Sequence, residues 1–146
     1  MKDSVYVSTI MTSSVVTLSI TDSLIKADAL FKEYKIRHLP VVENGKLIGM
    51  LSLTDLTRIS LAEFNEEGNT IVGTTLYNMF SLEQVMTKDL VTVQVDDSVQ
   101  SVAKILGEKD FRALPVMAGK VLVGILTTTD LIKYLLEQYE KNAMKE

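Results

Sequence analysis

Two short passages of the sequence end in an aspartate that follows a run of apolar residues. The first, "GMLSLTD", ends at Asp55, and the second, "GILTTTD", ends at Asp130. Hydroxyl side chains stand just before each aspartate: Ser52, Thr54, Thr127 and Thr129. A carboxylate only accepts hydrogen bonds, so one aspartate can bind both hydroxyls of a vicinal diol. The residues of both passages are therefore compatible with binding a diol.

The same spacing also fits the start of a helix. A hydroxyl residue followed three positions later by an acidic residue is the capping-box pattern, which satisfies the first N–H groups of a helix without any ligand. Ser52 with Asp55 and Thr127 with Asp130 both match this pattern. The sequence leaves the ligand-binding and the helix-capping interpretations open.

Basic side chains precede a second repeated passage. Arg37 and His38 stand before "LPVV", and Arg112 stands before "ALPV". A planar guanidinium matches the oxygens of a phosphate, and a helix beginning at Thr54 or Thr129 would add unpaired N–H groups. As alternatives, the two arginines are solvated residues before a strand, and His38 has a structural role. His38 is the only histidine, so no multi-histidine metal site is expected.

These passages belong to a repeat that covers most of the chain. Residues 10–59 align with residues 85–134 without a gap, and about one third of the aligned positions are identical. Each half predicts a short strand, a helix, two strands joined by a turn, and a second helix, in the order β-α-β-β-α. A lone unit of this kind leaves one sheet face bare, so we expect the two copies to pair with approximate two-fold symmetry.

The boundaries of the predicted elements carry local signals. Asp22 and Ser23 offer side-chain oxygens that cap the first helix, and Ser98 does the same in the second copy. Asn44-Gly45 is typical of a tight hairpin turn, because both residues tolerate positive φ. The last helix is expected from about Leu131 to Tyr139.

Composition excludes several classes of function. The 146-residue chain has a formal charge of −4, with basic and acidic residues interspersed, and so has no cationic face for nucleic acid. It holds no cysteine, which excludes disulfides, thiolate metal sites and thiol nucleophiles. No apolar run reaches the roughly 18 residues that a membrane-spanning helix needs. Catalytic histidine pairs and Gly-rich phosphate loops are also absent, so we expect a soluble cytoplasmic protein that is not an enzyme.

The ordered combination of motifs, found twice in one chain, resembles the CBS domain, which is named after cystathionine β-synthase and occurs in tandem pairs called Bateman modules. The resemblance rests on "IMTSSVVTLSITDSLIKADALF", "IRHLPVVENGKLIGMLSLTDL" and their equivalents in the second copy. It implies an α/β fold of two β-α-β-β-α units packed as a pseudo-two-fold pair. The expected division is a first domain at 1–62, a connector at 63–80, and a second domain with a C-terminal helix at 81–146.

The resemblance also implies a ligand and a site. Members of the family commonly bind AMP, ADP, ATP or S-adenosylmethionine in clefts between the two domains, and no further cofactor is required. The aspartate of the motif accepts hydrogen bonds from the ribose, nearby hydroxyl groups assist, and basic residues before the Pro-Val strand meet phosphates. Ala113 replaces the second polar residue of that basic position, which weakens the expected phosphate site in the second copy. The predicted ligand-binding residues are Asp55, Asp130, Ser52, Thr54, Thr127, Thr129, Arg37, His38, Arg112, Pro40, Pro115, Thr17 and Thr92.

The expected function is regulatory: the module senses an adenosyl ligand and passes the signal to an unidentified target protein. The alternative is a non-catalytic dimerisation or scaffold module whose clefts are unoccupied. A homodimer is expected in both cases. The C-terminal segment "LIKYLLEQY" supports dimerisation, because Leu131, Leu135 and Tyr139 would form one apolar stripe on a helix.

Overall fold

The structure is a computed structural model of the chain, and it describes residues 5–61 and 77–144. Most of the connector expected at 63–80 therefore lies outside the described residues. The chain divides into two compact units, one of Val16–Leu90 and one of Met1–Val15 together with Val91–Glu146. We call them the Asp55 unit and the Asp130 unit after the aspartate that each contains.

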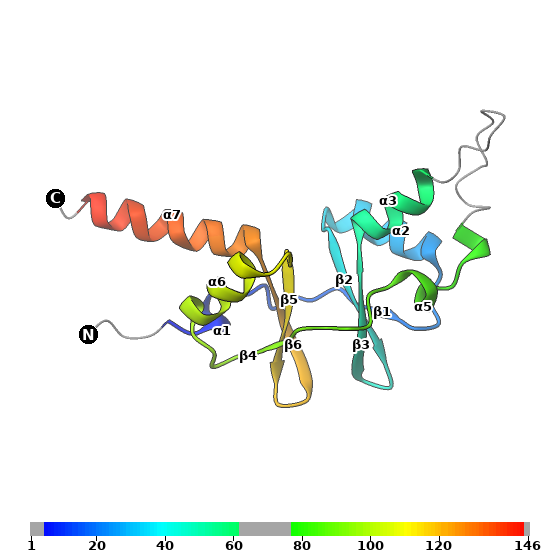
Figure 1. The fold of residues 1–146 in the computed structure, drawn as a ribbon, viewed down its shortest axis with the longest axis horizontal. Helices are drawn as coiled ribbons and strands as arrows, with labels where there is room; N and C mark the ends of the chain where they lie inside the picture. The colour runs from blue at the N-terminus through cyan, green and yellow to red at the C-terminus, as the bar shows by residue number, and fades with distance from the viewer. Residues whose placement is uncertain (1–4, 62–76, 145–146) are drawn as a thin grey trace. The chain divides into compact units, whose positions relative to one another are not determined.

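The Asp55 unit is built on a three-stranded sheet. Its elements are β1 (Leu18–Ser19), α2 (Leu24–Tyr34), β2 (His38–Glu43), β3 (Lys46–Ser52), α3 (Leu53–Leu61) and α5 (Leu82–Val85). The strand order is β1-β2-β3; β1 runs parallel to β2, and β2 runs antiparallel to β3 (Figure 1). Asn44 and Gly45 join the last two strands with φ values of 50° and 78°, as a tight hairpin turn requires.

The Asp130 unit repeats this plan. Its elements are α1 (Val7–Ile10), β4 (Val93–Gln94), α6 (Val99–Glu108), β5 (Ala113–Ala118), β6 (Val121–Thr127) and α7 (Thr128–Met144). The sheet has the order β4-β5-β6, again with one parallel and one antiparallel pair. The predicted α/β class and the β-α-β-β-α order of both copies are confirmed.

Local side-chain caps begin the first long helix of each unit. Ser23 Oγ accepts a hydrogen bond from Lys26 N at 3.1 Å, and Ser98 Oγ accepts one from Ser101 N at 3.1 Å. Asp22 does not cap α2 itself: its carboxylate accepts from Ser19 N at 2.8 Å and closes the turn before the helix. These local bonds explain why α2 and α6 begin where the sequence predicts.

Each unit has its own apolar core between sheet and helices. In the Asp55 unit, Leu18, Leu39 and Leu51 from the three strands are fully buried against α2 and α3. The equivalent core of the Asp130 unit contains fully buried Val116 and Leu126. Burying one such side chain contributes about 1.5–3 kcal/mol, so each core stabilises its own sheet.

A short lead-in segment precedes each copy of the repeat, at 7–12 and at 82–87, and begins with a short helix. The two lead-ins are exchanged between the halves of the sequence. The α1 segment precedes the first copy but contacts β6 and α7 of the Asp130 unit, while α5 precedes the second copy but lies beside β3 (Figure 1). Thr12 exchanges two backbone hydrogen bonds with Ile125, both 2.9 Å long, and Thr87 exchanges two with Met50, 2.9 and 3.0 Å long. Because β3 and β6 are edge strands, each lead-in pairs with an open sheet edge, at one residue of the strand.

The domain boundaries expected at 1–62 and 81–146 were drawn from the sequence repeat, and they stay a prediction. In space, each compact unit includes the lead-in of the other half. Among the described residues, no helix is long and apolar enough to cross a membrane.

Candidate functional site

In the Asp55 unit, the candidate site lies where β3 passes directly into α3. Asp55 Oδ2 accepts a hydrogen bond from Ser52 N at 3.1 Å, and Ser52 Oγ accepts one from Asp55 N at 3.0 Å. The two residues thus form a reciprocal capping box, and the helix-capping interpretation is confirmed here. The cap fixes the direction of the carboxylate and uses only one of its two oxygens.

The Asp130 unit contains the same arrangement where β6 passes into α7. Asp130 Oδ2 accepts from Thr127 N at 3.1 Å, and Thr127 Oγ1 accepts from Asp130 N at 3.1 Å. A further hydroxyl reaches this carboxylate, since Thr12 Oγ1 lies 3.3 Å from each of its oxygens. The lead-in of one sequence half therefore contacts the candidate site residue of the other half.

Capping does not exclude ligand binding at these carboxylates. An ionised carboxylate has about four acceptor positions, and the cap uses one of them. The side chain of Asp55 is 18% exposed, and Arg58 Nη1 lies 3.7 Å from its Oδ1. Asp130 is likewise partly exposed. Both carboxylates are therefore held in a fixed direction while they remain accessible from solvent.

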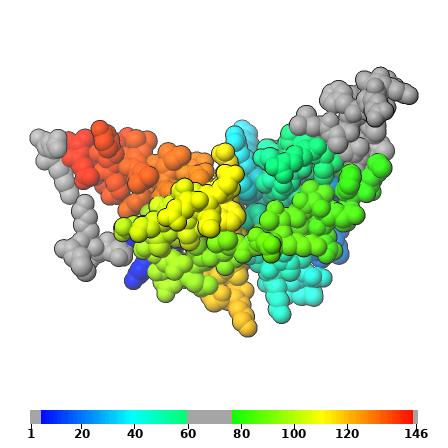
Figure 2. Space-filling view, viewed as in Figure 1, coloured from blue at the N-terminus to red at the C-terminus, as the bar shows by residue number. Residues whose placement is uncertain are grey.

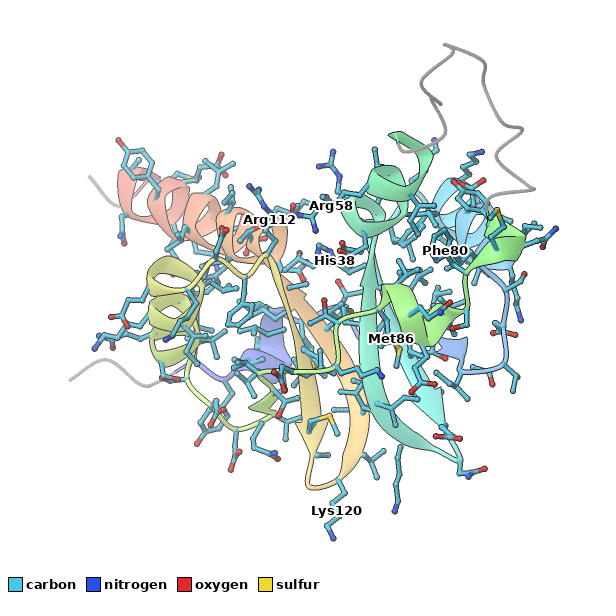
Figure 3. The ribbon with its side chains drawn as sticks, turned by 45° about the vertical axis from the view of Figure 1, so that its right-hand side comes forward. His38, Arg58, Phe80, Met86, Arg112 and Lys120 are labelled. Atoms are coloured by element: carbon cyan, nitrogen blue, oxygen red, sulfur yellow. The ribbon has the colours of Figure 1, made fainter. Side chains whose placement is uncertain are left out.

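The basic residues are brought beside the caps by the sheet register. His38 pairs with Ser52 across β2 and β3, and the carbonyl of Arg37 accepts a hydrogen bond of 2.8 Å from Leu53 N. Figure 3 shows His38 and Arg58 on the elements that meet at this end of the Asp55 unit. The side chain of Arg37 is exposed and that of His38 is half-buried. The backbones of Arg37 and His38 therefore lie beside the Asp55 cap, and the side chain of Arg58 approaches its carboxylate.

In the second copy, the same register brings a smaller basic group to the cap. Ala113 pairs with Thr127, and the carbonyl of Arg112 accepts from Thr128 N at 3.0 Å. Arg112 is exposed. The imidazole of His38 in the first copy thus corresponds to the methyl group of Ala113 in the second.

The other predicted site residues lie farther along the same strands. Pro40 and Pro115 are buried in β2 and β5, whereas Thr17 and Thr92 are exposed immediately before β1 and β4. Thr54 and Thr129 are exposed in the first turn of α3 and α7, and the capping hydroxyls are those of Ser52 and Thr127 instead. The role of these six residues in ligand binding stays a prediction.

Two residues near the carboxylates were missed by the sequence interpretation, namely Thr12 and Arg58. Thr12 matches Thr87 in the repeat, but nothing in that match indicates a partner more than a hundred positions away. Arg58 stands three positions after Asp55, a spacing that places two helical side chains side by side and so could have been noticed. Among the residues that the structure describes, no group of three His, Cys, Asp or Glu side chains could hold a metal ion.

Known proteins are similar to this chain in sequence. The protein MJ1404 of Methanocaldococcus jannaschii is 35% identical over 155 residues, an alignment that covers 100% of this chain and 35% of that protein. A homoserine O-acetyltransferase of Methanohalobium evestigatum is 31% identical over 92% of this chain, which spans 24% of the enzyme. The chain thus corresponds to about a third or less of the length of these two relatives.

Solved structures agree over nearly the whole chain. The AcuB protein of Vibrio cholerae has a TM-score of 0.79 at 28% identity, and the match covers 99% of both chains. The CBS domain pair of protein MJ0100, crystallised with 5′-methylthioadenosine and S-adenosyl-L-methionine, has a TM-score of 0.77 at 24% identity and covers 93% of this chain and 99% of that one. At 24% identity, the second likeness concerns the fold.

The CBS domain family matches the sequence twice, over residues 7–62 and 82–137. The first match runs from α1 to α3 and the second from α5 into α7. Each therefore contains one complete β-α-β-β-α unit. Together they account for most of the chain. With the fold, the repeat and the two caps in agreement, this chain belongs to the CBS domain family and carries two of its domains in tandem.

Proposed function

We propose that this CBS domain pair is a regulatory module that binds an adenine nucleotide or another adenosyl compound through Asp55 and Asp130. The observation that supports the proposal is the pair of equivalent capping boxes, which orient one carboxylate in each unit. A side chain that is already fixed loses little entropy when it binds, so the caps prepare both aspartates to accept hydrogen bonds from ribose hydroxyls.

The neighbouring side chains complement the rest of such a ligand. Arg37 and His38 in one unit and Arg112 in the other carry the donors that phosphate oxygens prefer. The first N–H groups of α3 and α7 add a positive dipole end beside them. The complex of MJ0100 with two adenosyl compounds supports the same ligand class at the level of the fold. AMP, ADP, ATP and S-adenosylmethionine are the candidates.

The proposed mechanism is a population shift. A ligand that binds one conformation of the module more tightly than another favours that conformation, and a separate target protein reads the change. We propose that the chain itself has no catalytic role, because its single histidine and lack of cysteine leave the usual nucleophile and base pairs without members. A cytoplasmic location is proposed on the same composition, since cysteine-free chains need no oxidising compartment.

The proposal is tested by thermal-shift measurements with AMP, ADP, ATP, S-adenosylmethionine and GTP. A ligand that binds only the native state raises the melting temperature, so at least one adenosyl compound should raise it and GTP should not. The 2′-deoxy form of the active compound should bind more weakly than the ribose form, because the carboxylate then lacks one donor. Equal affinity for both forms would show that the aspartates do not bind the sugar.

Variants of the aspartates need a design that keeps the caps. Alanine at either position removes the carboxylate and the cap together, and the cap alone is worth about 0.5–2 kcal/mol. Asp55→Asn and Asp130→Asn keep an amide oxygen that can accept from the same backbone N–H. Each should lower ligand affinity with little change in unfolding. A ligand response that is unchanged in both variants contradicts the proposal.

A second role, as a dimerisation module, is favoured by the surface of α7. The helix has no buried residue over its 17 positions, and it lies on the surface in the space-filling view (Figure 2). Its large exposed apolar side chains are Ile132, Leu135, Leu136, Tyr139 and Met144, of which the first four repeat at helical spacing. The predicted stripe is wrong at Leu131, which packs against the core of the Asp130 unit. We propose that the corrected stripe, which repeats at helical spacing, binds a second copy of the chain.

A further inference from the structure

Arg58 distinguishes the Asp55 site from the Asp130 site. Its Nη1 lies 3.7 Å from Asp55 Oδ1, while the cap holds Oδ2 at 3.1 Å from Ser52 N. Both oxygens of this carboxylate therefore have a donor beside them. The Arg58 side chain is 74% exposed, so its guanidinium can move away from the carboxylate without leaving solvent.

The equivalent position in the Asp130 unit is Lys133. Within 5–61 and 77–144, no ion pair joins Lys133 to Asp130 or to another carboxylate. The Asp130 oxygens instead accept from the neutral hydroxyl of Thr12. The two capping boxes are alike, but a cation stands beside one carboxylate and a hydroxyl beside the other.

This difference has a consequence for any ribose that binds the carboxylates. At Asp55, a sugar hydroxyl that binds Oδ1 on the side of Arg58 displaces the guanidinium. An exposed ion pair contributes little stability, so displacement costs little, and the freed guanidinium can pair with another anion. A phosphate on the same ligand provides that anion with bidentate geometry. At Asp130, the sugar displaces only a hydroxyl, so binding releases no cation from the carboxylate.

We propose that Arg58 is a specificity-determining residue that makes the Asp55 site select phosphorylated adenosine compounds, whereas the Asp130 site has no such requirement. The inference rests on the proposed function, because it needs a ribose at each carboxylate. Arg37 does not explain the difference, since Arg112 matches it in the second copy. His38 does differ, as Ala113 replaces it, and so it is tested separately.

The experiment is isothermal titration calorimetry of the full chain with ADP and with adenosine. An Asp130→Asn background restricts binding to the Asp55 site while it keeps an acceptor for the α7 cap. Charge-assisted hydrogen bonds of this kind correspond to about tenfold or more in affinity. Arg58→Gln should therefore weaken ADP about tenfold and leave adenosine within about twofold. The salt dependence of ADP binding should become shallower in the same variant.

Lys133→Gln in the same background is the matched control, because it removes one positive charge at the equivalent position of the other unit. It should leave the ratio of ADP to adenosine affinity unchanged. His38→Ala should leave most of that ratio in place. If His38→Ala removes the ratio while Arg58 is intact, or if Arg58→Gln weakens both ligands equally or neither, Arg58 is not the determinant.

The failure of this inference differs from the failure of the proposed function. If both ligands bind the Asp55 site and the ratio does not depend on Arg58, only the inference is overturned. If ADP, adenosine and the other adenosyl candidates all fail to bind the unmodified chain, the adenosyl-binding function is refuted and the role of Arg58 is refuted with it.

Discussion

Replacing Gly49 by alanine should destabilise the Asp55 unit through a single contact with the exchanged lead-in. A methyl group at this position would lie 2.5 Å from Met86 Sδ, 3.0 Å from its Cε and 3.1 Å from its Cγ. Carbon atoms in ordinary contact are about 3.5–4.0 Å apart, so the thioether must move by about an ångström. Met86 is only 8% exposed, which leaves little free space for that movement.

The expected magnitude follows from two opposing effects. Overpacking of a core position costs about 1–3 kcal/mol, whereas the loss of a glycine restricts the unfolded chain and returns about 0.4–1 kcal/mol. We therefore expect Gly49→Ala to lower the free energy of unfolding by about 1–2 kcal/mol. Met86→Ala alone should cost about 2–5 kcal/mol, because it empties a buried site. The double variant should be less destabilised than the sum by roughly 1–2 kcal/mol, since the new methyl group then has room.

The assay is equilibrium urea unfolding followed by circular dichroism, with two controls. Gly107→Ala adds a methyl group that meets nothing within 4 Å in α6, and it should stabilise the protein by about 0.5–1 kcal/mol. Gly49→Ala combined with Met11→Ala should be additive within about 0.5 kcal/mol, because Met11 packs against Gly124 instead. Coupling of Gly49 to Met11 rather than to Met86 would refute the exchange of the lead-in segments.

Three other changes test separate parts of the structure. Leu135→Asp should convert a dimer to a monomer in sedimentation-velocity runs, because it places a charge in the α7 stripe. Val121→Asp, which charges an equally exposed apolar position on β6, should leave the dimer intact. A dimer that survives Leu135→Asp excludes the α7 stripe as its interface. Thr12→Val removes the hydroxyl that reaches Asp130, so it should lower the unfolding free energy by about 0.5–1.5 kcal/mol, measured in urea, and a fully neutral result would argue against that bond. Ser23→Ala removes the cap of α2 and should cost about 1 kcal/mol in the same measurement, whereas an equal loss on substitution of the exposed Ser19 would contradict the assignment of the cap.

Much of each unit could be predicted because its signals are local. The caps at Ser23 and Ser98, the turn at Asn44-Gly45 and the alternation of apolar residues each act within a few positions, so a single sequence carries them. The capping boxes were predicted for the same reason. Their geometry confirms the helix-capping interpretation. It is also compatible with ligand binding, since the cap uses only one oxygen of each aspartate.

The lead-in exchange could not be predicted, and the reason lies in the repeat itself. Met11-Thr12 and Met86-Thr87 are identical in sequence, and so are the glycines that their methionines meet. Local pattern therefore cannot tell which sheet either lead-in covers. The error at Leu131 has a different cause. The helical spacing was right, but α7 begins at Thr128, and its first turns contact the core before the helix becomes exposed.

The caps and the proposed ligand recognition depend on the same two carboxylates. Helix capping alone requires only an equal cap in each unit, and both units have one. The third partner differs, however: a guanidinium lies beside Asp55, while the hydroxyl of an exchanged lead-in contacts Asp130. Because Thr12 lies six residues before β1, a ligand that takes its place at Asp130 also acts on the segment that leads into the other copy. The two carboxylates thus have the same cap but different neighbouring donors, so the proposed ligand would compete with a guanidinium at Asp55 and with a hydroxyl at Asp130.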